Sequence, residues 1–319
     1  MKFLRAALLL ALLAKPIRAQ SGLYAPLVLQ LPASTRMLAM GNMGVAGRDD
    51  DVLFANPAQL VVARGTSLSG ERYSSTSSGL ALSSASAFNN GGIAVGVSLV
   101  DYDSPFGTFP SNRETMRVAG PGTGLSVNAA LGIAQVVKSI RVGGAVKYVE
   151  DDLPNVRASR GVVDVGLAKD MWRYYTVALA VQNIGAGTSM PCEIVVQSVD
   201  CSHSLSTGFR PGSTVVPMPI RTTLGIAGAA PAGEFDLVGT AGVSVLRKDF
   251  VIPAGGAEIG YSWLDGYNIA LRAGARRPLT GEGPFTVGAG FRMDRLFIDY
   301  ALETLSNSRV AHRVGLRVR

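Results

Sequence analysis

Few side chains in this sequence have the types and spacing that catalysis requires. The chain has two histidines, His203 and His312, and two cysteines, Cys192 and Cys201. A catalytic triad needs a nucleophile, a histidine and an acid that converge, and a zinc site usually needs three or four ligands. Residues 41–47 are rich in glycine, but no phosphate-binding Lys-Ser or Lys-Thr pair follows them. The sequence therefore predicts no enzyme, metal site or cofactor. A Ser-Lys or paired-carboxylate mechanism stays open, because it leaves no motif.

Charged residues recur on one side of short alternating segments. In residues 284–293, Arg292 shares a face with Thr286, and Phe285 and Val287 share the opposite face. In the core of a soluble sandwich such charges would be prohibitive, but in the wet lumen of a barrel they can pair across strands at little cost. We predict that the following charges line a lumen, where they hold a plug rather than a substrate: Arg141, Arg221, Arg272, Arg292, Asp294, Asp299 and Arg313.

Fourteen segments with this alternation fill the chain from Gly65 to Arg319. Successive side chains of a strand point to opposite faces, so each segment has one apolar face and one face of small or polar residues. We predict strands over residues 65–73, 77–88, 91–101, 122–134, 139–150, 158–168, 173–183, 218–228, 233–246, 254–263, 266–276, 284–293, 295–303 and 310–319.

The connections between these segments alternate between short and long. The two longest, 102–121 and 184–217, fall on the same side. Outer-membrane barrels have short periplasmic turns and longer extracellular loops, whereas a sandwich has no reason to sort its loops in this way. The sequence therefore predicts an all-β protein: a 14-stranded antiparallel transmembrane β-barrel in the outer membrane of a Gram-negative-type bacterium, surrounded by its lipid.

The N-terminus predicts export. Lys2 and Arg5 precede an apolar run over residues 6–14, and a small residue, Ala19, follows it. This order is typical of a signal peptide, here residues 1–19, with an N-terminal anchor as the alternative. Four positive charges of the net +7 lie in this segment, so the mature chain would carry only about +3 and no nucleic-acid partner is predicted. In an exported protein the neighbouring Cys192 and Cys201 predict a disulfide, with free thiols as the alternative.

Residues 20–64 precede the first predicted strand and do not alternate. They contain a small, glycine-rich stretch over 39–47 and a turn signal at Asn56-Pro57. Their apolar content argues against a disordered periplasmic tail. We predict that residues 20–64 form a plug inside the barrel of residues 65–319.

The plug residues resemble a known family. Arg36–Ala46, with Gly41 and Gly44, then Asp49–Asp51, then Asn56, Pro57 and Ala58, is similar to the N-terminal plug motif of the FadL superfamily, and within it to the PorV/PorQ branch. The rest of the chain shares only the 14-strand architecture. Two features depart from the family: Gln59 stands where glycine is common, and Val318-Arg319 stand where a terminal aromatic is common.

The resemblance implies two functions. PorV/PorQ members serve type IX secretion and carry or attach exported proteins, so the partners would be exported proteins or secretion components. FadL members pass long-chain fatty acids or other hydrophobic molecules, which would require an apolar path. The predicted inward positions are instead small residues and paired charges, with Phe297 as the main inward aromatic. We therefore expect a secretion accessory whose working surface is the long loops. A transporter of hydrophobic molecules is the alternative.

Overall fold

The structure is a computed structural model of the 319-residue chain. It describes residues 26–32, 34–48, 51–74, 77–103, 123–153, 156–172, 174–191, 213–246, 250–279, 282–305 and 309–319. The predicted signal peptide, the Cys192–Cys201 disulfide and most of the two longest loops lie outside the described residues.

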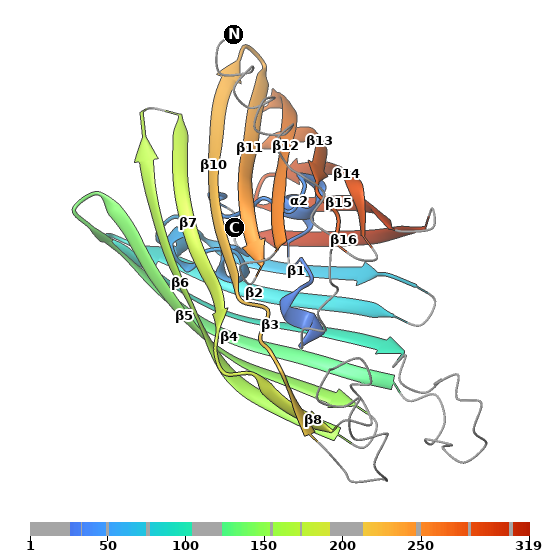
Figure 1. Ribbon diagram of the computed structural model, residues 1–319. Coiled ribbons are helices and arrows are strands. Elements are labelled where there is room, and N and C mark those ends of the chain that lie inside the picture. Colours follow the sequence, from blue (N-terminus) through green and yellow to red (C-terminus); the bar gives the residue numbers. More distant parts are fainter. Residues whose placement is uncertain are drawn as a thin grey trace.

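Fourteen antiparallel strands form a closed barrel (Figure 1), in which each strand pairs with the next and the first, β1, pairs with the last, β16. The predicted all-β barrel is confirmed. Its strands are β1 (Gly65–Arg72), β2 (Ser78–Phe88), β3 (Gly91–Asp103), β4 (Thr123–Val137), β5 (Ile140–Leu153), β6 (Val156–Met171), β7 (Tyr175–Ile184), β10 (Arg221–Ala232), β11 (Phe235–Leu246), β12 (Phe250–Leu264), β13 (Tyr267–Arg276), β14 (Glu282–Met293), β15 (Leu296–Leu305) and β16 (Val310–Val318).

One pair of strands was not predicted. β8 (Thr188–Pro191) pairs with β9 (Ser213–Val216) in a separate two-stranded sheet, inserted between β7 and β10. β7 pairs directly with β10, so the insertion leaves the barrel intact. These two strands are short and lack the long period-two pattern that marks the barrel strands.

The outer face of the barrel is apolar. Large hydrophobic side chains are exposed along it, among them Ile133 (62% exposed), Val146 (57%) and Leu271 (60%). Between them, inward-facing residues such as Ala134, Ala145 and Arg272 are buried. Exposed apolar residues that alternate with buried small or polar ones are the pattern of strands that face lipid. Among the described residues, no helix has the length and apolarity to cross a membrane.

Tight turns connect the strands at one end of the barrel. At the β4–β5 turn, Lys138 and Ser139 have φ of 47° and 68°, as a two-residue type I′ hairpin requires. Gly233 and Gly266 have φ of 70° and 83° in the β10–β11 and β12–β13 turns. The long connections all leave from the opposite end. By the rule for outer-membrane barrels, the short-turn end is periplasmic and the long-loop end is extracellular.

The N-terminal residues lie inside the barrel (Figure 1). They form four short helices: η1 (Leu27–Leu29), α2 (Thr35–Ala39), η2 (Val52–Phe54) and η3 (Pro57–Val61). We call residues 26–64 the N-terminal segment. The core of the protein lies between this segment and the inner face of the strands, where Leu38, Leu53 and Leu60 are fully buried.

Candidate functional site

Glycines on the inner wall allow the N-terminal segment to touch the strands. A Cβ atom added at Gly143 would lie 2.4 Å from the backbone of Pro57, and one at Gly256 would lie 2.6 Å from that of Met40. A larger side chain at either position would collide with the segment. At each glycine of a set that we call the glycine girdle, an added Cβ atom would lie less than 3.0 Å from an atom of the N-terminal segment. The set is Gly92, Gly96, Gly132, Gly143, Gly166, Gly225, Gly242, Gly256, Gly274, Gly288 and Gly315.

The second half of the segment, residues 51–64, is held by apolar contacts. Val52, Leu53 and Leu60 are fully buried in one cluster, together with small alanines of β2 to β5 such as Ala94 and Ala134. Small wall residues bring the leucines close to the backbone of the barrel. Burial of a leucine side chain contributes about 1.5–3 kcal/mol, so this cluster is a strong attachment.

Asn56 organises the same half. Its Oδ1 accepts a hydrogen bond from the backbone N–H of Ala58 at 3.0 Å and so caps η3. Its Nδ2 donates to the carbonyl of Val45 at 2.9 Å and to that of Leu167, on β6, at 3.3 Å. Pro57 occupies the first helical position, where a missing N–H costs nothing. The Asn-Pro-Ala motif thus joins both halves of the segment to the wall.

The two motif glycines lie in the first half, residues 34–48. Gly41 has a φ of 75°, which favours glycine, and its N–H donates to Thr286 Oγ1 on β14 at 3.0 Å. A Cβ at Gly44 would lie 1.9 Å from the sulfur of Met37, so a side chain there would have to displace the Met37 side chain from its buried position. The structure thus brings all five predicted motif residues to turns or close contacts of the N-terminal segment.

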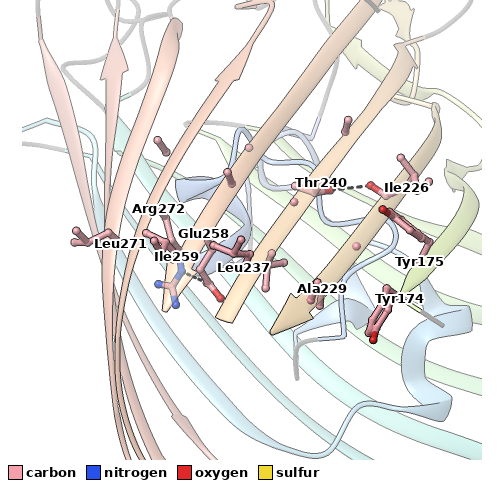
Figure 2. A pocket seen from close by; sticks show the side chains of 18 residues that line it. Tyr174, Tyr175, Ile226, Ala229, Leu237, Thr240, Glu258, Ile259, Leu271 and Arg272 are labelled. Atoms are coloured by element: carbon pink, nitrogen blue, oxygen red, sulfur yellow. Dashed lines mark hydrogen bonds and ion pairs between the residues drawn. The ribbon is translucent and has the colours of Figure 1, made fainter. Parts of the chain in front are cut away.

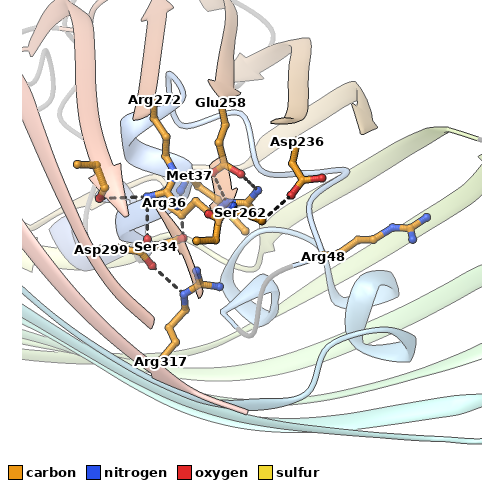
Figure 3. Close-up of polar contacts among 12 residues, drawn as sticks. Ser34, Arg36, Met37, Arg48, Asp236, Glu258, Ser262, Arg272, Asp299 and Arg317 are labelled. Carbon is orange, nitrogen blue, oxygen red and sulfur yellow. Dashed lines mark hydrogen bonds and ion pairs between the residues drawn. The ribbon is translucent and has the colours of Figure 1, made fainter. Parts of the chain in front are cut away.

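A chain of ion pairs connects the first half to β12–β16 (Figure 3). Arg36 binds Glu258 in a bidentate pair, with Nε and Nη2 each 2.7 Å from a carboxylate oxygen. Arg272 also binds Glu258 and lies 2.7 Å from Asp299 Oδ1. Arg317 Nε lies 2.9 Å from Asp299 Oδ2. The network alternates in charge and spans five residues, four of them on the wall.

Two further arginines of the predicted lumen set are also paired. Arg141 donates to Asp170 at 2.7 Å, and Arg48 of the segment donates to the same carboxylate at 2.9 Å. At the long-loop end, Arg313 lies 2.6 Å from Glu71 and also donates to the carbonyl of Pro32, in the segment.

Tyr73, which follows the last residue of β1, also binds Glu71. The Tyr73 hydroxyl donates to Glu71 at 2.7 Å. Burial, helped by the nearby carboxylate, raises the pKa of the Tyr73 phenol well above its usual value. Tyr73 therefore remains a proton donor, and Glu71 accepts hydrogen bonds from both Tyr73 and Arg313.

Three predicted lumen charges occupy different surroundings. Arg221 is half-buried and lines a cavity of about 60 Å³ beside the segment. Arg292 is exposed at the short-turn mouth, where its guanidinium lies 5.4 Å from the centre of the Phe297 ring. Asp294 does not line the lumen: it is exposed in the β14–β15 turn at a φ of 52°, a conformation that aspartate tolerates better than most residues.

The long-loop half of the lumen is more apolar than the sequence predicts. Val100, Val149, Val162 and Met218 are buried around Val28 of η1. This apolar cluster lies beside the predicted paired charges, such as Arg313 with Glu71 and Arg276 with Glu303, and it was not predicted from the sequence. Val149 and Val162 alternate with exposed residues, so the strand period could have identified them as inward-facing.

Sequence reasoning missed three acidic partners and one arginine. Glu258, Asp170 and Glu71 face inward and receive the arginines, and the strand alternation could have found them. Arg36 carries no such signal, because its contact with Glu258 joins residues far apart in the chain. Among the described residues, no group of three or more metal-ligating side chains comes together.

No protein-family model matches the chain, and no curated protein matches its sequence. Among solved structures, the chain is similar to a crystal structure of a Pseudomonas aeruginosa FadL homologue, with a TM-score of 0.55 and 11% identity over 93% of this chain and 99% of that one. It is also similar to a deltaS2 mutant of the TodX monoaromatic hydrocarbon channel (TM-score 0.55, 12% identity, 92% and 98% covered). The CymD monoaromatic hydrocarbon channel gives a TM-score of 0.54 and 11% identity, over 92% and 98%.

At these identities the similarity shows a shared fold. The chain has the fold of FadL-type barrels, as the plug motif predicted, and nothing in the similarity singles out the PorV/PorQ branch. A closed 14-stranded barrel of this fold with an apolar outer face is an outer-membrane protein of Gram-negative type.

Proposed function

We propose that this protein is an outer-membrane channel for hydrophobic small molecules and that the N-terminal segment is its plug. The observation that carries the proposal is the apolar cluster in the long-loop half of the lumen, where Val28 and its neighbours pack against Val149 and Val162. In this arrangement an apolar piece of the chain itself occupies the space that an apolar ligand would need. The fold shared with two proteins named as monoaromatic hydrocarbon channels supports the proposal.

The plug would work by steric closure. The glycine girdle permits backbone contact around the lumen, so little room remains between the segment and the wall. A molecule that crosses must displace part of the segment or follow a narrow path beside it. The 60 Å³ cavity at Arg221 is too small for such a molecule, because ligand pockets usually measure roughly 300–1,000 Å³.

An uptake assay tests the proposal. Cells without another channel of this type would express the full-length chain, and uptake of a long-chain fatty acid and of a monoaromatic hydrocarbon would be measured. We expect uptake of at least one of them to rise above background and to fall several-fold in Val162→Asn, which places an amide in the apolar cluster.

The matched control is Gly161→Ser on the same strand. A Cβ at Gly161 meets no atom within 4 Å, so this variant should transport normally. Folded barrel would be quantified in the outer membrane for every variant. Uptake at background level by a correctly folded wild-type barrel, for both probes, would contradict the transport function.

The secretion-accessory hypothesis rests on the family resemblance. It predicts that the long extracellular loops carry the function, and most of those residues lie outside the described part of the chain. No contact among the described residues favours it over transport, so we do not propose it as a second function.

A further inference from the structure

The outer face of the barrel presents mostly apolar side chains to lipid. Along β10–β13, for example, Leu237, Ile259 and Leu271 are exposed and line a cavity of about 810 Å³ (Figure 2). The two charged residues that line this cavity, Glu258 and Arg272, bind each other in the ion-pair network of the inner face. Charge in this part of the wall is therefore turned toward the lumen and paired.

The outer face differs where the last strand meets the first. Arg72, the last residue of β1, lies directly opposite His312 of β16. Both side chains are exposed, whereas Glu71, Ala311 and Arg313, which precede or follow them along the strands, are buried against the lumen. Arg72 and His312 therefore point to the lipid side. They lie at the long-loop end of their strands, which is the extracellular end.

Tyr300 of β15 orients the imidazole of His312. Its hydroxyl lies 2.7 Å from His312 Nδ1, and the two rings are 6.1 Å apart. With the phenol as donor, the neutral imidazole carries its proton on Nε2, the nitrogen directed away from Tyr300. The protonated imidazole keeps the same Nε2–H. In both states His312 offers an N–H to a ligand on the outer face.

The Arg72 side chain is held beside the β1–β2 connection. Its Nε donates to the carbonyl of Ser74 at 3.1 Å, and a guanidinium carries five N–H donors in a fixed plane. We call Arg72, Tyr300 and His312 the outer donor cluster. Its three residues come from three adjacent strands, β1, β16 and β15.

Electrostatics at the outer donor cluster favour an anion. Basic side chains directly opposite each other in an antiparallel pair have Cβ atoms roughly 4.5–5.5 Å apart, and they repel when both are charged. The described outward-facing residues of β15, β16, β1 and β2 include no acidic side chain. On β3, two strands from Arg72, Asp101 is exposed. An anion between Arg72 and His312 would relieve the repulsion.

The surroundings of the cluster favour a lipid as the source of that anion. Leu68, Val314 and Leu316, further along the same strands, are exposed on the outer face. A charged group held by the cluster would thus lie beside a surface that suits acyl chains. The extracellular leaflet of a Gram-negative outer membrane is rich in phosphorylated glycolipid, whose phosphates lie at this end of the barrel.

We propose that the outer donor cluster binds a phosphate of a lipid A-type glycolipid in the extracellular leaflet. The Arg72 guanidinium donates to the phosphate oxygens, and His312 Nε2–H donates to the same group. Tyr300 is a positioning residue, because it acts through the imidazole. The site lies outside the lumen and goes beyond the proposed transport function.

The two histidines of the chain provide the assay. His203→Gln, in a long loop outside the described residues, leaves His312 as the only histidine, so its imidazole can be observed alone by NMR after histidine-selective labelling. The full chain would be refolded in a phosphate-free nonionic detergent and titrated with bisphosphorylated lipid A. We expect a saturable shift of the His312 nitrogen signals. Lipid A without phosphate, and inorganic phosphate at the same concentration, should give no saturable shift.

Substitutions in the His203→Gln background separate charge from structure. Arg72→Gln should weaken lipid A binding by roughly five- to tenfold, the effect of losing one charge-assisted contact at an exposed site. Arg72→Lys keeps the charge and should recover most of that loss. The matched control is Arg157→Gln, since Arg157 is an exposed arginine at the same end of β6 that already binds Glu150.

Tyr300→Phe tests the positioning role. It should change the ratio of the two imidazole tautomers, which the nitrogen shifts of His312 report, and weaken lipid A binding by about two- to fivefold. A residue that only packs against the ring would leave the tautomer ratio unchanged.

Four results would overturn the proposal. The first is the same shift of His312 with and without phosphate on the lipid, which would mean apolar contact alone. The second is an equal shift with inorganic phosphate, which would make the ligand a free ion. The third is equal weakening by Arg72→Gln and Arg157→Gln, and the fourth is no saturable shift at all in a folded barrel. None of these outcomes depends on transport through the lumen.

Discussion

The two halves of the N-terminal segment are attached to the barrel by different physical means. Residues 51–64 bury leucines against the small residues of β2–β5, and Asn56 adds hydrogen bonds at β6. Residues 34–48 also bury apolar side chains, Leu38 and Met43 among them, and in addition they meet β11–β16 through ion pairs and hydrogen bonds with threonine side chains. Thr240 Oγ1, for example, donates to the carbonyl of Met43 at 2.7 Å.

This difference has a consequence for movement of the N-terminal segment. Apolar burial in a dry cluster is insensitive to salt, whereas the Arg36–Glu258 pair, whose side chains are 18% and 11% exposed, should weaken as ionic strength rises. The first half of the N-terminal segment therefore loses part of its attachment when salt rises, whereas the second half keeps its apolar contacts. We expect residues 34–48 to leave the wall before residues 51–64 do at high ionic strength.

The largest effect should come from Leu53→Ala. This side chain is fully buried, and loss of a buried leucine costs about 2–5 kcal/mol. Hydrogen exchange of residues 51–62 should show a decrease of this size in the free energy of local opening. Leu131→Ala is the control, because Leu131 faces lipid and is 55% exposed. Equal effects of the two variants would mean that the leucine cluster does not hold the segment.

Asn56→Ala should have the next largest effect. It removes the cap of η3 and leaves the carbonyls of Val45 and Leu167 without their donor, at a cost of about 1–3 kcal/mol in the free energy of local opening. Gly166→Ala should disrupt the same contact from the barrel side, because its Cβ would lie 1.9 Å from Asn56 Oδ1. Gly161→Ala on the same strand meets nothing and is the control. Unchanged exchange in both Asn56→Ala and Gly166→Ala would show that the motif does not hold the N-terminal segment.

The strands could be predicted from the sequence because a barrel wall in lipid needs period-two alternation along its whole length. The N-terminal segment was predicted as a unit, but its contacts were not. Arg36 and Glu258 meet only after the barrel has closed, and no local pattern pairs them. Glycines of the girdle such as Gly143 look in the sequence like ordinary relief of crowding, and only their position opposite Pro57 gives them a role.

The ion-pair attachment should be weaker and should depend on salt. A double-mutant cycle of Arg36→Met and Glu258→Gln should give a coupling of about 1 kcal/mol in the local opening of residues 34–48. Arg272 keeps Asp299 as a partner in both backgrounds, so the cycle reports mainly the Arg36 pair. The coupling should shrink when salt is raised, while the Leu53→Ala effect stays constant. A coupling that persists in high salt would mean that this half is as dry as the other.

Arg48→Gln should have the smallest effect. Its guanidinium lies 2.9 Å from Asp170, but the two side chains are 57% and 51% exposed, and exposed ion pairs contribute about 0–1 kcal/mol. Asp170 also retains Arg141 and Thr176 as donors, so no charge is left without a partner. Hydrogen exchange of residues 41–48 should therefore change little, and Asp170→Asn, which removes the negative charge and one of the two acceptor oxygens that three donors share, should change it more. If Arg48→Gln loosened the segment more than Glu258→Gln does, the first half would be anchored at the periplasmic mouth and not at β12–β13. The expectation that residues 34–48 leave the wall through loss of the Arg36–Glu258 pair would then be wrong.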